Sequence, residues 1–113
     1  MNPETAKRLY RDNLYEPVTI RRIVGAGSTK VIETYVSHGR VYRGERRELV
    51  GGIAQQEYNA VVDATQLFNS GLVGDVQTQD YLIDMNGKRY TVTEVKPRRV
   101  KTTMVGYKLT LKA

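Results

Sequence analysis

The sequence predicts a mainly β protein: a small antiparallel β-barrel of five to six strands with an N-terminal α-helix and a short helical turn. Three observations lead to this prediction. The 113 residues suit a single domain, 1–113. After the first fifteen residues, β-branched and alternating apolar runs follow one another at turn-length spacing. No helical stretch long enough for a crossover separates them, which favours antiparallel pairing over a parallel α/β sheet.

The N-terminal helix is expected over residues 1–15. Asn2 is a good capping residue, and Pro3 suits the first helical position. Apolar residues then recur at spacings of three and four, at Ala6, Leu9, Tyr10 and Leu14. Glu16-Pro17 ends the pattern, because the residue before a proline is disfavoured in the helical region. The barrel is therefore expected over residues 18–113.

The first strands follow directly. Val18–Val24 is rich in β-branched residues, its doubled Arg21-Arg22 indicates a bulge, and a glycine-rich turn follows it. Lys30–Arg43 is a longer extended run, interrupted by Gly39. Residues 43–52 are charged at their start and end in glycine, which predicts a long loop.

The second half of the chain alternates more clearly. Residues 58–64 alternate as a half-buried strand, and Leu67, Phe68 and Leu72 predict about one helical turn. Asn86-Gly87 predicts a two-residue type I′ turn that pairs Met85 with Lys88 and places the following residues on one face: Tyr81, Ile83, Tyr90 and Val92. Residues 96–101 form a basic connector, and apolar positions alternate from Val105 to Leu111 in the closing strand.

Composition excludes several function classes. There is no Cys, so disulfides, thiolate metal sites and a cysteine nucleophile are excluded, and His38 is the single His. Gly25–Lys30 has the wrong order for a phosphate-binding loop, and Asp75, Asp80 and Asp84 lack the spacing of a calcium loop. No apolar run approaches the roughly 18 residues of a membrane helix. We expect no enzyme activity, cofactor, metal or membrane partner.

The charge distribution leaves a nucleic-acid partner open. Lys and Arg total 18 against 12 Asp and Glu, a net charge of +6. The basic residues gather in two stretches of the predicted barrel, at Arg40, Arg43, Arg46 and Arg47 and at Lys96, Arg98, Arg99 and Lys101. Tyr35 and Tyr42 lie near the first stretch, as in barrels that stack single-stranded bases. Glu45 and Glu48 interleave with its arginines, so an ordinary solvated surface is the competing interpretation.

The order of elements carries a resemblance. The chain begins with a basic helix, an extended pair and a charged segment ending Leu49-Val50-Gly51-Gly52-Ile53. It continues with a strand through Tyr58, the Asn86-Gly87 hairpin with Tyr90 and Val92, a basic connector and a closing strand. This order resembles the head-closure (stopper, or head-tail joining) proteins of long-tailed bacteriophages, prophages and gene transfer agents. It extends from Pro17 to the end of the chain.

The resemblance implies a structural virion protein. Such proteins form rings of six or twelve copies beneath the portal and its adaptor, close the exit channel on packaged double-stranded DNA, and provide the platform for tail terminator or tail tube proteins. It implies a virion location at the head-tail interface, with the host cytoplasm as the place of assembly. A small basic barrel that binds nucleic acid, and a neighbouring tail-joining or tail-terminator ring protein, are the alternatives.

The resemblance also implies roles for particular residues. Residues 43–52 fall where the family carries a loop that projects into the channel, so the gating residues would be Arg43, Gly44, Glu45, Arg46, Arg47, Glu48, Gly51 and Gly52. The residues that dock on the adaptor or tail, or face DNA, would be Lys7, Arg8, Arg11, Arg40, Lys96, Arg98, Arg99 and Lys101. The N-terminal helix is an addition to the minimal barrel.

Overall fold

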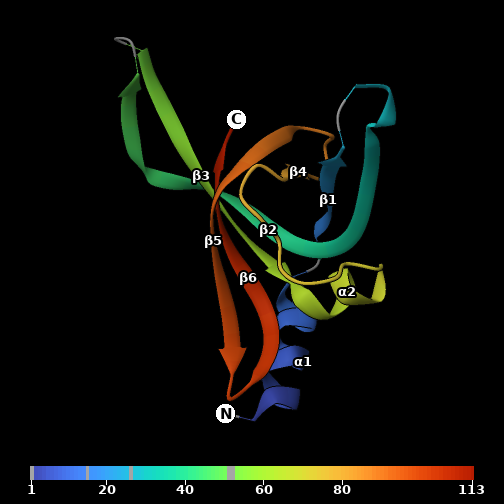
Figure 1. The fold of residues 1–113 in the computed structure, drawn as a ribbon. Helices are drawn as coiled ribbons and strands as arrows, with labels where there is room; N and C mark the ends of the chain where they lie inside the picture. The colour runs from blue at the N-terminus through green and yellow to red at the C-terminus, as the bar shows by residue number, and fades with distance from the viewer. Residues whose placement is uncertain (1, 15, 26, 51–52) are drawn as a thin grey trace.

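The protein is a closed barrel of six antiparallel strands in the order β1-β2-β3-β6-β5-β4 (Figure 1). The computed structural model describes residues 2–14, 16–25, 27–50 and 53–113, without the side chains of residues 10, 12, 13, 44–50 and 53–56. The elements are α1 (Pro3–Asn13), β1 (Glu16–Val24), the 3-10 turn η1 (Gly27–Thr29), β2 (Val31–Val50), β3 (Ile53–Asp63), α2 (Ala64–Asn69), β4 (Tyr81–Ile83), β5 (Arg89–Val100) and β6 (Thr103–Lys112). The predicted fold class is confirmed.

Helix α1 begins where its capping signal places it. The Asn2 side-chain oxygen accepts a hydrogen bond from the Thr5 amide at 2.8 Å, and Pro3 is the first helical residue. The helix ends at Asn13, two residues before the predicted boundary. Its apolar side buries Ala6, and Leu14 is buried just after its end, while the helix lies against β3, β5 and β6. The helix therefore covers part of the outer surface of the barrel.

The core is made of inward-facing residues from all six strands, which alternate with outward-facing residues along each strand. β3 buries Ala60 and Val62, as the alternation predicts, and β6 buries Val105, Tyr107, Leu109 and Leu111. The largest fully buried side chain is Tyr107, whose hydroxyl donates to Asp75 Oδ1 at 2.9 Å. Burial raises the pKa of Tyr107 strongly, so the hydroxyl stays protonated and keeps this bond.

Strand β2 bends sharply as it passes from β1 to β3. A Cβ on Gly39 would lie 2.4 Å from the Val61 carbonyl oxygen and 3.3 Å from the Val62 Cα, both backbone atoms. Only glycine allows this close approach without a backbone shift. Gly39 thus lets one strand serve two neighbours, β1 through its first half and β3 through its second.

The predicted loop at residues 43–52 is wrong for its described part. Beyond an irregularity between Arg43 and Arg47, β2 continues to pair with β3, from Arg47 opposite Gln56 to Val50 opposite Ile53. Figure 1 shows this pair, the β2–β3 arm (residues 43–50 and 53–58), extending well beyond the barrel. The prediction failed because strand-forming residues flank Gly51-Gly52 on both sides, which is a hairpin pattern. Gly51 and Gly52 themselves lie outside the described residues.

The β4–β5 hairpin differs from its predicted register by one residue. Leu82 pairs with Tyr90, and Ile83 with Arg89, so Leu82 is buried with Tyr90 and Val92, while Tyr81 and Ile83 are only partly buried. Asp84 Oδ1 accepts from the amides of Asn86 and Lys88, both at 2.9 Å, and the Gly87 amide donates to the Asp84 carbonyl. With Gly87 at φ 84° and Asn86 outside the positive-φ region, this is a type I turn with a glycine bulge.

Two further predictions need correction. Residues 96–100 of the predicted basic connector belong to β5, and the chain turns at residues 101 and 102. Pro97 lies opposite Tyr107 of β6, but β4 pairs only with residues 89–91, so at Pro97 the other edge of β5 is not paired with β4, and proline is tolerated on such an edge. Arg21 and Arg22 form no bulge, since β1 pairs with β2 and β4 in continuous register.

Arg22 instead holds the segment between α2 and β4. Its Nε and Nη2 donate to the two carboxylate oxygens of Asp80, both at 2.9 Å, and Nη2 also donates to the Asp75 carbonyl at 3.0 Å. Asp80 Oδ2 accepts in addition from the Gln77 amide at 2.9 Å. This Arg22–Asp80 clamp lies largely away from solvent, with side-chain exposures of 16% and 4%. It fixes residues 75–80 against β1.

Candidate functional site

The strand register brings distant basic residues into one row. Arg40 of β2 lies opposite Val61 of β3, Val61 opposite Lys108 of β6, and Lys108 opposite Lys96 of β5. Residues directly opposite one another share a face of the sheet, and this is the outer face, because Ala60 and Val62 point inward. We call Arg40, Lys108 and Lys96 the basic row. Arg40 and Lys96 were predicted site residues, whereas Lys108 was not, because only the strand pairing places it beside them.

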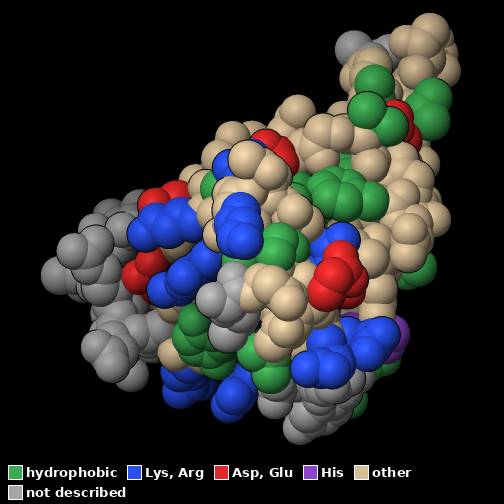
Figure 2. All heavy atoms as spheres, turned by 90° about the horizontal axis from the view of Figure 1, so that it is seen from below, with side chains coloured by type: hydrophobic (Ala, Val, Ile, Leu, Met, Phe, Trp, Pro, Cys, Tyr) green, Lys and Arg blue, Asp and Glu red, His purple; other side chains and the backbone are tan. Residues whose placement is uncertain are grey.

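A second cluster lies next to this row. Arg98 of β5 is opposite Gly106, and Gly106 is opposite Asp63, one row further along the same face. Helix α1, with Lys7, Arg8 and Arg11, packs against these strands. Figure 2 views this end of the molecule and shows Lys and Arg side chains spread over it. The structure therefore gathers the predicted residues of α1 and β5 at one end.

The β2–β3 arm lies elsewhere. In Figure 1 it projects from the opposite end of the barrel from the β5–β6 turn. Arg43 at its base is exposed. Of the other predicted gating residues, Gly44, Glu45, Arg46, Arg47 and Glu48 belong to strand β2, and Gly51 and Gly52 lie outside the described residues. The described members of the predicted gating set thus lie in a different part of the molecule from the predicted docking residues, apart from Arg40.

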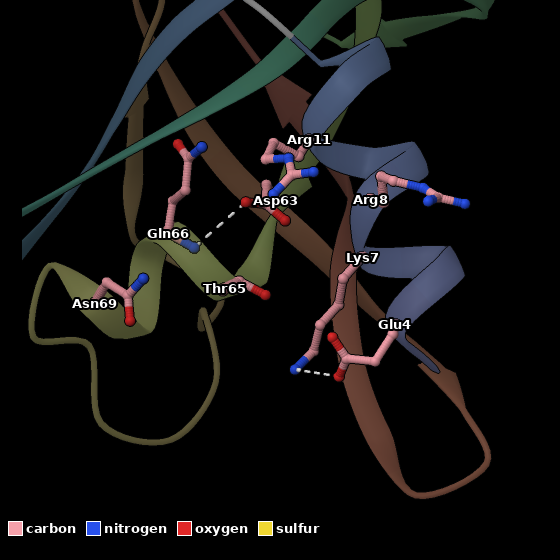
Figure 3. A pocket seen from close by; sticks show the side chains of 8 residues that line it. All are labelled: Glu4, Lys7, Arg8, Arg11, Asp63, Thr65, Gln66 and Asn69. Carbon is pink, nitrogen blue, oxygen red and sulfur yellow. Dashed lines mark hydrogen bonds and ion pairs between the residues drawn. The ribbon is translucent and has the colours of Figure 1, made fainter. Parts of the chain in front are cut away.

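Between α1 and α2 the surface is hollowed by a cleft of about 550 Å³, the α1–α2 cleft (Figure 3). Its lining residues are Glu4, Lys7, Arg8, Arg11, Asp63, Thr65, Gln66 and Asn69. Lys7 Nζ lies 3.8 Å from Glu4 Oε1 in an exposed pair. Lys7, Arg8 and Arg11 were predicted site residues, whereas the residues on the α2 side of the cleft were not. Asp63 followed three residues later by Gln66 is a capping pattern that marks it.

Asp63 is the unusual residue of the cleft. It caps α2, with Oδ2 accepting from the Gln66 amide at 3.3 Å, yet the residue is only 2% exposed because α1 and α2 cover it. Within the described part of the chain, its buried Oδ1 has no hydrogen-bond partner. Burial raises the pKa of the Asp63 carboxyl, an effect that the Gln66 and Thr65 amides and the nearby His38 and Arg11 partly offset.

A smaller hollow of about 330 Å³ lies at the base of the arm, lined in part by Tyr42, Tyr58 and Tyr90. The Tyr58 and Tyr90 rings meet edge to face with centroids 5.1 Å apart. The Lys88 ammonium lies 4.9 Å from the centre of the first ring and 5.1 Å from that of the second. The Lys88 side chain therefore makes cation–π contacts with both rings, and this cluster connects β3 to the β4–β5 turn.

His38 and the carboxylates of the described residues do not gather into one group. His38 Nδ1 is hydrogen-bonded to Gln66 Oε1, and no group of three or more His, Asp or Glu that could hold a metal ion occurs among the described side chains. In the same part of the chain, neither helix has the length and apolar character needed to cross a bilayer. Comparison of the sequence with family models and with curated proteins gives no match.

Proposed function

We propose that this chain is a structural, non-enzymatic component of a phage head-tail connector. It would form a ring below the portal and adaptor, close the DNA exit channel after packaging, and give the tail its attachment site. The proposal combines the resemblance in element order with one structural observation, the β2–β3 arm. Glu57 and Tyr58 at the base of the arm still pair with β6, but within the described part of the chain residues 47–50 and 53–56 pair only with each other, and such open outer edges favour association with further chains.

A ring assembly is compatible with the positions of the arm and the basic surface at opposite ends of the molecule. The arm extends from one end, and the α1 and β5–β6 basic surface occupies the other. In a ring, every subunit contributes the same arm and the same docking surface, so weak single contacts act together. In this proposal the arms face the channel, while Lys7, Arg8, Arg11, Lys96, Arg98, Arg99 and Lys101 contact the adaptor or tail proteins.

Gene disruption tests the proposal directly. Lysates of the phage or prophage that encodes the chain would be viewed by negative-stain microscopy after the gene is inactivated. Tailless heads beside separate finished tails are the expected result, and empty heads would add the closure role. Full, sealed heads without tails would indicate the neighbouring tail-joining or tail-terminator role. Normally tailed particles would refute the connector proposal.

A shortened arm tests the gate. The variant removes residues 45–56 and joins Gly44 to Glu57 through an Asn-Gly turn, which preserves the pairing of Arg43 with Tyr58 and the whole barrel. In complemented particles we expect a several-fold loss of DNase-protected DNA. The matched control replaces residues 25–30 by Asn-Gly, which shortens the β1–β2 hairpin beyond the pair Val24 and Val31. Equal DNA retention by the two variants would contradict a gating arm.

The basic row supports direct nucleic-acid binding as a second candidate function. Contact of the three basic-row residues and of Arg98 in the neighbouring row with four phosphates would give a log-log salt slope of about −3.6 for duplex DNA. Affinity would then fall roughly 150-fold between 50 and 200 mM salt. Arg40→Glu should lower the slope by about one. Absence of binding at physiological salt would remove this candidate.

A further inference from the structure

We propose that the outer edge of strand β2 at residues 31–35 is a docking surface for a second copy of this chain, with the two edges paired antiparallel about a two-fold axis at Ile32. The inference goes beyond the connector role. A two-fold contact joins two copies and then closes, whereas a ring of six or twelve copies joins two different surfaces of each copy.

One edge of the β1–β2 hairpin is open. Strand β2 pairs with β1 from its first residue, whereas β3 joins the other side of β2 only at Gly39. The Val36 amide points to that other side, because it donates to Ser70 Oγ at 2.9 Å. The N–H and C=O groups of successive residues alternate between the two sides of a strand, so Ile32 and Thr34 also present theirs to the open side. Within the described part of the chain, no strand pairs with them there.

Apolar side chains flank this open edge. Ile32 of β2 is 58% exposed and lies directly opposite Ile23 of β1, which is also exposed. Val31 and Val24, the next pair toward the turn, are exposed as well. Figure 2 shows hydrophobic side chains on the β1–β2 hairpin where it projects from the barrel. Exposed β-branched residues beside an unpaired strand edge favour the addition of another strand.

The residues of this edge restrict how two copies can pair symmetrically. Pairing centred on Thr34 or further along would need the Val36 amide, which already has its acceptor. Pairing centred on Glu33 would set two carboxylates directly opposite each other, and like charges in that position are destabilising. Pairing centred on Val31 would place Thr34 opposite the η1 turn of the second copy instead of a strand. Ile32 is the remaining centre.

Pairing centred on Ile32 uses both open residues. The two Ile32 residues exchange N–H···O hydrogen bonds, and each Thr34 amide faces the Lys30 carbonyl of the second copy. On one face the two Ile32 side chains then lie opposite each other, flanked by the two Ile23 side chains. The result is a row of four isoleucines across a continuous four-stranded sheet. Because only two hairpins meet, the contact is small, and we expect a dissociation constant of about 0.01–1 mM.

The first test measures self-association of the full chain by sedimentation velocity, from about 10 µM to about 1 mM. We expect a concentration-dependent shift from monomer to dimer and no larger species, because a two-fold contact closes on itself. Ile32→Lys should weaken the dimer about tenfold or more, since it places charges in the row of isoleucines. Val73→Lys is the matched control: Val73 is 87% exposed and lies outside the hairpin, so this variant should dimerise like the unmodified chain.

The second test determines the register by cross-linking. The chain has no Cys, so a single introduced thiol can form a disulfide only with the same position in a second copy. Ile32→Cys would place the two thiols directly opposite each other, on Cα atoms about 5.5 Å apart, which suits a disulfide. In a glutathione redox buffer it should form covalent dimer about tenfold faster than Val73→Cys, although Val73 is the more exposed position.

Several results would overturn the proposal. A chain that stays monomeric at about 1 mM would leave the edge to an extended segment of a different protein. Oligomers larger than a dimer would indicate pairing between two different surfaces. Equal dimerisation of Ile32→Lys and the unmodified chain, or equal cross-linking of Ile32→Cys and Val73→Cys, would place the contact elsewhere. None of these outcomes affects the gene-disruption experiment, since the two-fold contact is not the one that builds a ring.

Discussion

Replacement of Asp80 by alanine should destabilise the protein more than any exposed charge change. The variant removes both Asp80 hydrogen bonds of the Arg22 guanidinium, keeps its bond to the Asp75 carbonyl at 3.0 Å, and leaves the Gln77 amide without its Asp80 acceptor. Loss of one partner from a buried ion pair costs about 3–5 kcal/mol. Because the Arg22 side chain is 16% exposed and can reach water, we take the lower end, about 3 kcal/mol.

The expected change in Tm follows from chain length. A domain of 113 residues unfolds with an entropy of about 0.24 kcal/mol/K, so a loss of about 3 kcal/mol lowers Tm by about 12 °C. Thermal denaturation followed by circular dichroism measures this shift. The exposed pair of Lys96 and Glu94, 3.5 Å apart with side chains 63% and 55% exposed, supplies the control: Glu94→Gln should cost less than about 0.5 kcal/mol.

A double variant distinguishes loss of the pair from an isolated charge. Arg22→Met combined with Asp80→Leu removes both charges, and an apolar pair of similar volume often replaces a buried ion pair without loss. We expect the double variant to recover most of the stability lost by Asp80→Ala, apart from about 1 kcal/mol for the Gln77 amide. A fall in Tm of less than about 4 °C for Asp80→Ala, or no recovery in the double variant, would refute this account of the clamp.

Two further predictions concern Gly39 and Asp63. Gly39→Ala places a Cβ 2.4 Å from the Val61 carbonyl oxygen and should lower the free energy of unfolding by about 3 kcal/mol, measured by urea denaturation. Gly87→Ala is the control: its strain comes only from a φ of 84°, and it should cost about 1–2 kcal/mol. Equal losses for the two variants would count against the close approach at Gly39. Burial raises the pKa of Asp63 above its unfolded value, so between the two values the folded chain holds more protons and its stability falls as pH rises. Asp63→Asn should therefore gain stability relative to the unmodified chain as pH rises from about 4, in parallel Tm measurements, and a constant difference would contradict this.

Local signals explain which parts of the fold could be predicted. The capping of α1 by Asn2 and the alternation of β3 and β6 depend on residues a few positions apart, and each was correct. The β4–β5 turn shows the limit. Asn86-Gly87 indicated a turn correctly, but the side chain of Asp84 selected a different turn type and shifted the register by one residue. A single side-chain acceptor outweighed the dipeptide preference.

The candidate sites also divide into features that local sequence predicts and features that depend on tertiary contacts. The sequence by itself determined the barrel class, the terminal helix and the basic character of α1 and β5, because periodicity and composition are properties of the chain. Only the tertiary structure decided that residues 43–50 pair with residues 53–58, that Lys108 joins Arg40 and Lys96, and that Asp63 is buried beneath two helices. The physical reason is that strand pairing and burial depend on neighbours that lie far apart in sequence, and a local pattern does not specify which neighbours those are.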